Sequence, residues 1–275
     1  MMNLKKYKLY KITAFIKKDF YIESSYKMAF LITILSSLFP VFSYFFIAKM
    51  LNKQSIPDIS SYSKDYFAFA LIGIAFSTYF NIAIQTFSGS MRRAQMAGCL
   101  EAILSSQTDP KSVVFLSSLY SFISTGVLLV LMFLVSWLFL GFSFANINIL
   151  STLVCIFFSL TTFISLGIFS GAGTIIFKQG DPFGFIFGSI SSLLGGAVFP
   201  ISILPGWLKS ISYMVPITYS LDSLRLSILK GQNICMLAKP IMILGIISLI
   251  LLPASLIFFN WAVEKGKRDG TLMQY

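Results

Sequence analysis

The sequence is poor in the residues that most catalytic and metal sites need. It has no histidine, three cysteines and 11% charged residues, whereas an average soluble domain has about 25%. The lack of histidine excludes His-based triads, His metal ligands and histidine proton switches. Cys99, Cys155 and Cys235 lie too far apart to provide a disulfide framework or a zinc spacing. We expect Cys155 to be a small apolar residue inside a span.

Charge is absent from long stretches of the chain, and these stretches predict the fold. A helix needs about 20 apolar residues to cross roughly 30 Å of hydrocarbon. We therefore predict an all-α integral membrane protein with six transmembrane helices. They fall at about residues 28–50, 66–87, 113–141, 149–177, 183–204 and 240–263. Residues 1–275 are interpreted as one transmembrane domain, with a basic interfacial helix at 1–27, the bundle at 28–263 and a cytoplasmic tail at 264–275.

The net charge of +11 comes from cations that gather beside the spans. With the N-terminus inside, 14 of the 21 lysines and arginines lie in inner segments. The positive-inside rule then predicts that both termini are cytoplasmic. This distribution favours membrane lipid over nucleic acid as the partner of the basic residues.

Residues 1–27 carry seven lysines and two acids. Leu9, Ile12, Ile16 and Phe20 would share one stripe of a helix there. The pattern predicts an amphipathic helix on the inner membrane surface. A plain basic leading segment is the alternative.

The polar segment 88–112 follows the second span on the inner side. Its centre has no proline, and Arg92, Arg93 and Glu101 offer charges before Asp109-Pro110 ends any helix. Either a protruding helix that docks into a cytoplasmic protein or a solvated loop explains this composition.

The segment 199–231 breaks the pattern on the outer side. Pro200 and Pro205-Gly206 interrupt a helix where the fifth span should end, which predicts a re-entrant helical segment. Leu221, Leu224 and Ile228 then predict an amphipathic helix, ended by Gly231. Asp222 and Arg225 are three apart and are expected to form a surface pair of little energetic weight.

Several small or amide residues stand out inside the spans. The amides of Asn81 and Gln85 should seek partners in protein rather than in lipid. Gly171-Ala172-Gly173 is expected to serve close helix packing rather than a nucleotide loop.

Two sequence regions resemble the type-2 ABC transporter permeases, the membrane subunits of bacterial exporters. The first is GGAVFPISILPGWL at 195–208, followed by VPITY at 215–219 and Leu224-Arg225. The second is GCLEAIL at 98–104, similar to the family's Gly-Thr-Leu-Glu stretch with Cys99 where threonine is usual. The family's Thr-Pro is here one residue longer, Thr108-Asp109-Pro110.

The resemblance implies a partner-driven exporter in the bacterial cytoplasmic membrane. Two permeases, identical or homologous, would each rest on an ABC ATPase subunit that carries ATP and Mg, so this chain would hold no cofactor and no catalytic or metal site. A coupling helix would enter the ATPase through Arg92, Arg93, Gly98, Leu100, Glu101 and Leu104. Spans one, two and five, with Asn81 and Gln85, would line the pathway.

An outer gate would lie at Val198, Phe199 and Pro200. Ordinary contact with core or lipid is the alternative for Val198 and Phe199. The expected cargo is amphipathic or hydrophobic: a drug, peptide, glycan or lipid.

Other functional classes fit the sequence less well. The spans contain no carboxylate or histidine that a proton-driven secondary transporter commonly uses, although backbone carbonyls can bind sodium. The carboxylates are too scattered for a membrane-embedded enzyme, and the uncharged, aromatic-rich spans do not suit an ion pore. No Gly-x-x-x-x-Gly-Lys-Ser/Thr loop is present, so energy is expected to come from another subunit.

Overall fold

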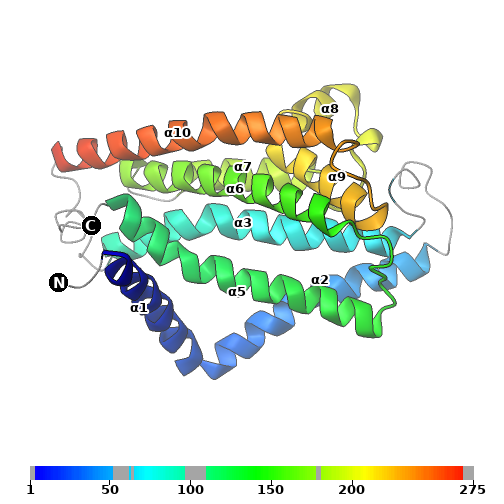
Figure 1. Cartoon of the computed structure of the whole chain (residues 1–275), viewed down its shortest axis with the longest axis horizontal. Helices are drawn as coiled ribbons and strands as arrows, with labels where there is room; N and C mark the ends of the chain where they lie inside the picture. The colour runs from blue at the N-terminus through cyan, green and yellow to red at the C-terminus, as the bar shows by residue number, and fades with distance from the viewer. Residues whose placement is uncertain (1–3, 52–61, 63–64, 97–109, 178–180, 269–275) are drawn as a thin grey trace.

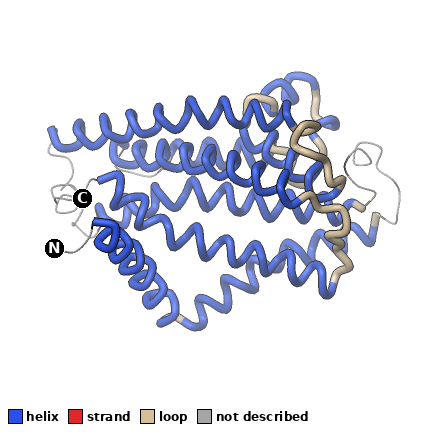
Figure 2. The backbone as a smooth tube through the Cα atoms, in the orientation of Figure 1, coloured by secondary structure: helices blue, strands red, loops and turns tan. Residues whose placement is uncertain are grey.

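The computed structural model describes residues 4–51, 62, 65–96, 110–177 and 181–268. Every regular element in these ranges is a helix (Figures 1 and 2). In chain order they are α1 Leu4–Ser25, α2 Lys27–Met50, α3 Tyr66–Met96, α5 Pro110–Phe139, α6 Ile149–Phe177, α7 Pro182–Leu194, the 3-10 turn η1 Ile201–Ile203, α8 Gly206–Ser212, α9 Pro216–Leu229 and α10 Ala238–Arg268.

Five of these helices, α2, α3, α5, α6 and α10, are long and apolar enough to cross a membrane. They correspond to five of the six predicted spans, which confirms an all-helical membrane architecture. The sixth prediction, a continuous span at 183–204, is wrong in its extent. Helix α7 has 13 residues and ends at Leu194, which is shorter than the ~20 residues that a crossing requires.

The centre of the bundle is α3, and α2 lies at its edge (Figure 1). In the most apolar stretch of each helix, 72% of the α3 residues are buried but only 6% of the α2 residues. One face of α3 packs against α6, which in turn packs against α10. Helix α2 approaches α3 near the α8–α9 end of the bundle and diverges from it toward α1.

Glycines on α6 allow this close packing. A Cβ on Gly167 would collide with the carbonyl oxygen of Ala83, and one on Gly171 would lie 3.3 Å from Cβ of Phe87. A Cβ on Gly173 would collide with the ring of Phe183. The prediction that the glycines at 171 and 173 serve helix packing is therefore confirmed.

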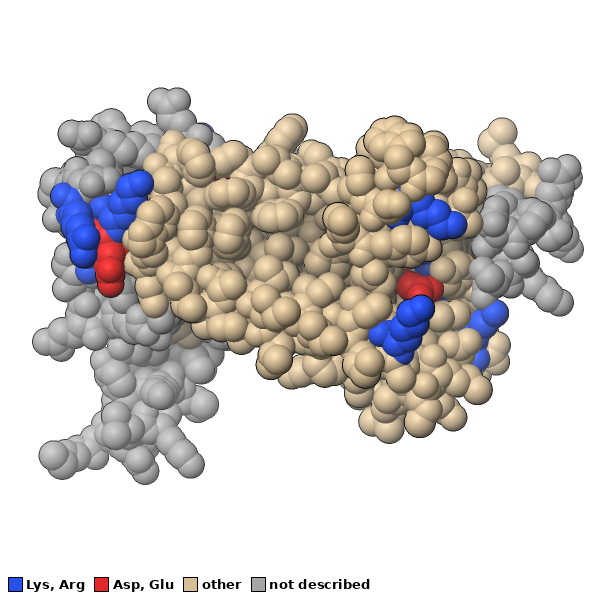
Figure 3. All heavy atoms as spheres, turned by 90° about the horizontal axis from the view of Figure 1, so that it is seen from above, with Lys and Arg blue, Asp and Glu red and all other residues tan. Residues whose placement is uncertain are grey.

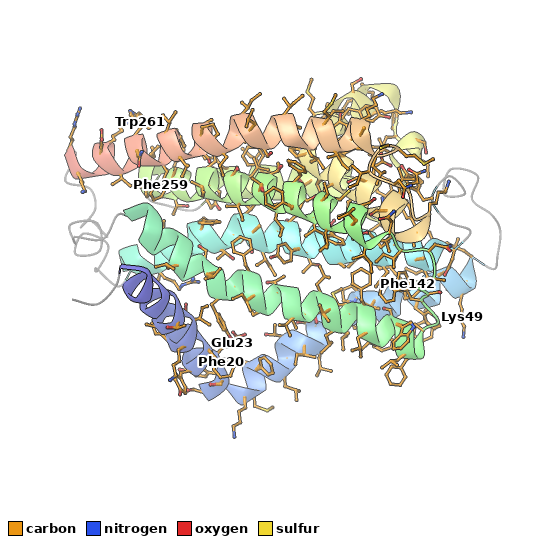
Figure 4. All side chains as sticks on the ribbon, viewed as in Figure 1. Phe20, Glu23, Lys49, Phe142, Phe259 and Trp261 are labelled. Atoms are coloured by element: carbon orange, nitrogen blue, oxygen red, sulfur yellow. The ribbon has the colours of Figure 1, made fainter. Side chains whose placement is uncertain are left out.

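Charged side chains gather at the two ends of the bundle, with an uncharged band between them on the face shown in Figure 3. Lys265, Lys267 and Arg268 form the last turn of α10, and the Lys265 Nζ lies 5.1 Å from the centre of the Trp261 ring. Lys49 and Phe142 lie at the opposite end from Trp261 (Figure 4). This distribution is typical of a membrane protein whose cations sit at the two interfaces.

Helix α1 occupies most of the basic leading segment and packs against α5. Phe20 and Glu23 are on its second half (Figure 4), and Phe20 is exposed. The side chains of Leu9 and Ile12 lie outside the described residues. The helix is therefore present, and its position on the membrane surface stays a prediction.

Candidate functional site

The chain between α7 and α10 forms a broken helical segment at one end of the bundle. After Leu194 the backbone leaves the helix, and Gly196 has a φ of +71° that favours glycine. Pro205 precedes α8, and Pro216 is the first residue of α9, the position in a helix that proline fits best. The predicted interruption is thus present.

Helix α9 matches the predicted amphipathic helix. Leu221, Leu224 and Ile228 are all buried. Beyond its end, Gly231 has a φ of +63°, and the amide of Gln232 donates to the carbonyl of Leu226 at 3.2 Å. This glycine-dependent C-cap ends the helix as the sequence indicates.

Hydroxyl groups fix α9 to α6. The Ser220 hydroxyl donates to the Ser159 hydroxyl at 2.5 Å, and Ser223 is hydrogen-bonded to the buried Cys155. The prediction that Cys155 is a small buried residue in a span is confirmed. Helix α9 therefore has a defined place on the core.

Arg225 joins α9 to two other parts of the fold. Its Nε donates to the carbonyl of Phe69 on α3 at 3.2 Å, and its two terminal nitrogens donate to Gly196 at 2.8 Å and Ala197 at 2.7 Å. The guanidinium carbon also lies 3.5 Å from the centre of the Phe69 ring. We call this set the Arg225 clamp. The prediction of a surface pair is wrong, because Arg225 is 3% exposed.

Asp222 provides the clamp with a nearby negative charge, and Tyr62 holds this carboxylate. The Asp222 carboxylate accepts a hydrogen bond from the Tyr62 hydroxyl. Burial raises the pKa of Asp222, and this hydrogen bond and the charge of Arg225 oppose that rise. The pKa of Tyr62 is also raised, mainly by burial and secondly by the Asp222 carboxylate. Burial lowers the pKa of Arg225, but a guanidinium stays charged in proteins. Three carbonyls and one carboxylate thus offset the cost of burying a cation.

Gly73 gives the clamp its close approach. A Cβ at this position would collide with the Ala197 carbonyl oxygen and would lie 2.5 Å from a terminal nitrogen of Arg225. Only a residue without a side chain lets α3 lie so near the segment 195–200. Sequence reasoning assigned no role to Gly73 and missed the clamp.

The predicted gate residues follow the clamp directly. Val198 and Phe199 are half-buried and Pro200 is buried. Val198 packs against the main hydrophobic core, which agrees with its alternative interpretation as a core contact. A gate role for the three residues stays a prediction, and the clamp fixes the backbone immediately before them.

Asn81 and Gln85, the predicted pathway residues, lie one turn apart on α3. Asn81 is half-buried and Gln85 is exposed. A Cβ on Gly188 of α7 would lie 3.3 Å from the amide oxygen of Asn81, so this side chain faces α7.

The predicted coupling residues are only partly described. Arg92 and Arg93 are exposed and belong to the last turns of α3, which continues to Met96. They extend the spanning helix itself. Gly98, Leu100, Glu101 and Leu104 lie outside the described residues.

Asp181 caps the helix that follows α6. Its carboxylate accepts from the Gly184 amide at 2.7 Å and from the Ser170 hydroxyl at 2.5 Å, which satisfies an otherwise free donor of the first turn of α7. Within the described ranges, no group of three His, Cys, Asp or Glu side chains could hold a metal ion.

These features define a multi-pass α-helical membrane protein with a broken helical segment at one end. A model of the ABC-2 type transporter family matches residues 11–229, a range that includes the clamp and the α3 amides. The chain therefore belongs to the ABC-2 type transporter family, as the sequence resemblance predicted, and is a membrane component of transport rather than a catalytic subunit. A search of curated protein sequences found no significant match.

Proposed function

We propose that the chain is the permease subunit of an ATP-driven exporter. It pairs with a second permease, identical or homologous, and each rests on an ATPase subunit in the bacterial cytoplasmic membrane. The pair moves an amphipathic or hydrophobic cargo outward, a class that includes drugs, peptides, glycans and lipids. The observation that carries the proposal is the family match over 11–229.

In this proposal both termini and the segment after α3 are cytoplasmic. The end that bears Arg92, Arg93 and the basic last turn of α10 then faces the ATPases and the inner lipid head groups. The clamp and α8–α9 lie at the outer end. The re-entrant segment is this broken stretch. Its irregular backbone is buried in protein at 195–197, as membrane depth would require, and is half-buried or exposed from Ile201 to Gly206.

Force enters at the inner end of α3 and opens a gate at its outer end. Arg92 and Arg93 dock on the ATPase together with Gly98, Leu100, Glu101 and Leu104. Because α3 is one helix from Tyr66 to Met96, displacement of its inner end also moves Phe69, which belongs to the clamp. Val198, Phe199 and Pro200 close the outer end of a path lined by Asn81 and Gln85.

The first test is purification of the tagged full-length chain from membranes of its native host under mild conditions. We expect an ABC ATPase to be retained, and its turnover to change when the permease is present in nanodiscs. If no ATPase is retained and the chain alone concentrates a solute with an ion gradient, the proposal is wrong.

Replacing both Arg92 and Arg93 with Gln is expected to uncouple ATP hydrolysis by the partner from the conformational change of the permease. Removing charges that pair with a partner weakens an interface by about tenfold or more. We expect normal insertion and ATP hydrolysis, with loss of the ATP-dependent change in labelling of a Phe199→Cys reporter by an impermeant maleimide. Arg268→Gln, which removes an exposed cation from the end of α10, is the matched control. An unchanged ATP response in the double variant would contradict a docking role for these arginines.

A further inference from the structure

We propose that Ser77, Asn81 and Gln85 bind an uncharged, hydrogen-bonding part of the cargo, a group rich in hydroxyls or amides. We call these residues the α3 row. This inference rests on the exporter function proposed above and adds the chemical class that the pathway accepts.

The α3 row begins two turns beyond the part of the helix that carries the clamp. Ser77, Asn81 and Gln85 follow at intervals of four, continuing from Phe69 and Gly73, and each step turns the position by about 40° around α3. The three residues of the row therefore lie within one quarter of the helix surface, and the row winds away from the side that Phe69 occupies. Gly73 is buried, Ser77 and Asn81 are half-buried, and Gln85 is exposed. Accessibility therefore rises along the row with distance from the clamp, as expected for a path that is closed at the clamp end and open toward the end with Arg92.

The polar groups of the row are not satisfied within the described part of the chain. The Ser77 hydroxyl is buried and has no hydrogen-bond partner. Among the described residues, the amides of Asn81 and Gln85 also have none. The neighbouring Thr78 differs, because its hydroxyl donates to the carbonyl of Ile74 at 2.9 Å. Unsatisfied polar groups at membrane depth are costly, so the row needs a polar occupant.

The chemistry of the row favours an uncharged occupant. A hydroxyl and two primary amides can each donate and accept, which matches cargo hydroxyls and amides. From Ser77 to Gln85 the helix carries no charge, and Arg225 already donates to three carbonyls. An ionised cargo group would lose its water beside the row without gaining a counter-charge.

The position of Asn81 favours cargo over a second permease as the occupant. Its amide oxygen faces Gly188 on α7 of the same chain, at 3.3 Å from where a Cβ would lie. The middle of the row therefore lies beside the chain's own α7 rather than on an outward ridge. Glycine at 188 lets the amide of Asn81 lie this close to the α7 backbone.

The test uses the full-length chain in native membranes and three photoreactive dodecyl probes. All three probes have the same dodecyl group and the same diazirine, and they differ in their head groups: maltosyl, phosphate and trimethylammonium. We expect the maltosyl probe to label peptides of α3, and unlabelled dodecyl maltoside to compete. Asn81→Leu with Gln85→Leu should reduce this labelling about tenfold, through the loss of hydrogen bonds to the head group.

Two further variants make the result specific. Thr78→Val removes a hydroxyl at the same depth that is already satisfied, and should leave labelling within about twofold. Asn81→Asp should shift preference toward the trimethylammonium probe, because it supplies the missing counter-charge. Equal labelling by all three head groups would overturn the inference, as would unchanged labelling of the double leucine variant. Retention of the ATPase, measured on the same membranes, tests the exporter function separately.

Discussion

Replacing Arg225 with Met is expected to release the outer segment from α3 and to destabilise the protein. The substitution keeps an apolar stem but removes the only described donors to the carbonyls of Gly196 and Ala197, which lie outside any helix. Orphaned buried carbonyls cost about 1–3 kcal/mol each, partly offset because a buried cation is also removed. We expect a net loss of about 2–4 kcal/mol, seen as a melting temperature lowered by about 5–10 °C in thermal scans by size-exclusion chromatography.

A second readout separates loss of the clamp from general instability. In a background without native cysteines, Phe199→Cys should react several times faster with an impermeant maleimide in intact cells when Arg225 is Met. Lys230→Gln removes a cation from the exposed end of α9 and should change neither value. Arg225→Lys should resemble Met more than wild type, because a single ammonium cannot reach three carbonyls as a planar fork does. If the Arg225→Met variant melts at the wild-type temperature and is labelled at the wild-type rate, the clamp does not hold this segment.

The spans could be predicted because their signal is local. An uncharged run of sufficient length is enough to define a helix in lipid, and the prediction of 149–177 coincides with α6, Ile149–Phe177. The start of α9 was equally readable, because proline at its first position and the spacing of Leu221, Leu224 and Ile228 are local features. Elements that a local pattern alone defines, such as α6 and α9, were therefore predicted close to their observed bounds.

The clamp depends on distant partners, so sequence reasoning missed it. Arg225 donates to Phe69 across 156 positions and to Gly196 across 29. One local signal was available. Arg225 follows Leu221 by four residues and precedes Ile228 by three, which places it on the buried stripe rather than on the polar face. A cation on an apolar stripe implies that carbonyl or carboxylate oxygens lie within hydrogen-bonding distance of it.

The length of α7 also escaped prediction for a physical reason. Hydropathy does not distinguish a helix from an irregular apolar segment, and residues 195–204 are uncharged and mostly apolar. The left-handed backbone at Gly196 and the hydrogen bonds that its neighbouring carbonyls accept from Arg225 end the regular helix there.

The predicted coupling residues from 98 to 104 lie outside the described residues, so their role stays a prediction.

Replacing Gly73 with Ala is expected to force α3 and the segment 195–200 apart. The new Cβ would collide with the carbonyl oxygen of Ala197, and a backbone atom cannot turn away as a side chain can. Overpacking of this kind costs about 1–3 kcal/mol and sometimes more. We expect a lower melting temperature and faster labelling of Phe199→Cys, as for Arg225→Met. Gly126→Ala on α5 is the matched control, because a Cβ there meets no atom within 4 Å, and it should be neutral or slightly stabilising.

The two substitutions should not be additive, because they break the same contact. Once Arg225 is Met, the Gly196–Ala197 backbone is free to move away from α3, and the extra methyl group at position 73 then costs little. The double variant should therefore be nearly as stable as the less stable single variant, with a coupling energy of about 1–3 kcal/mol. Additive losses in a double-mutant cycle would show that Gly73 and Arg225 act on separate parts of the fold, and that the clamp is not one unit.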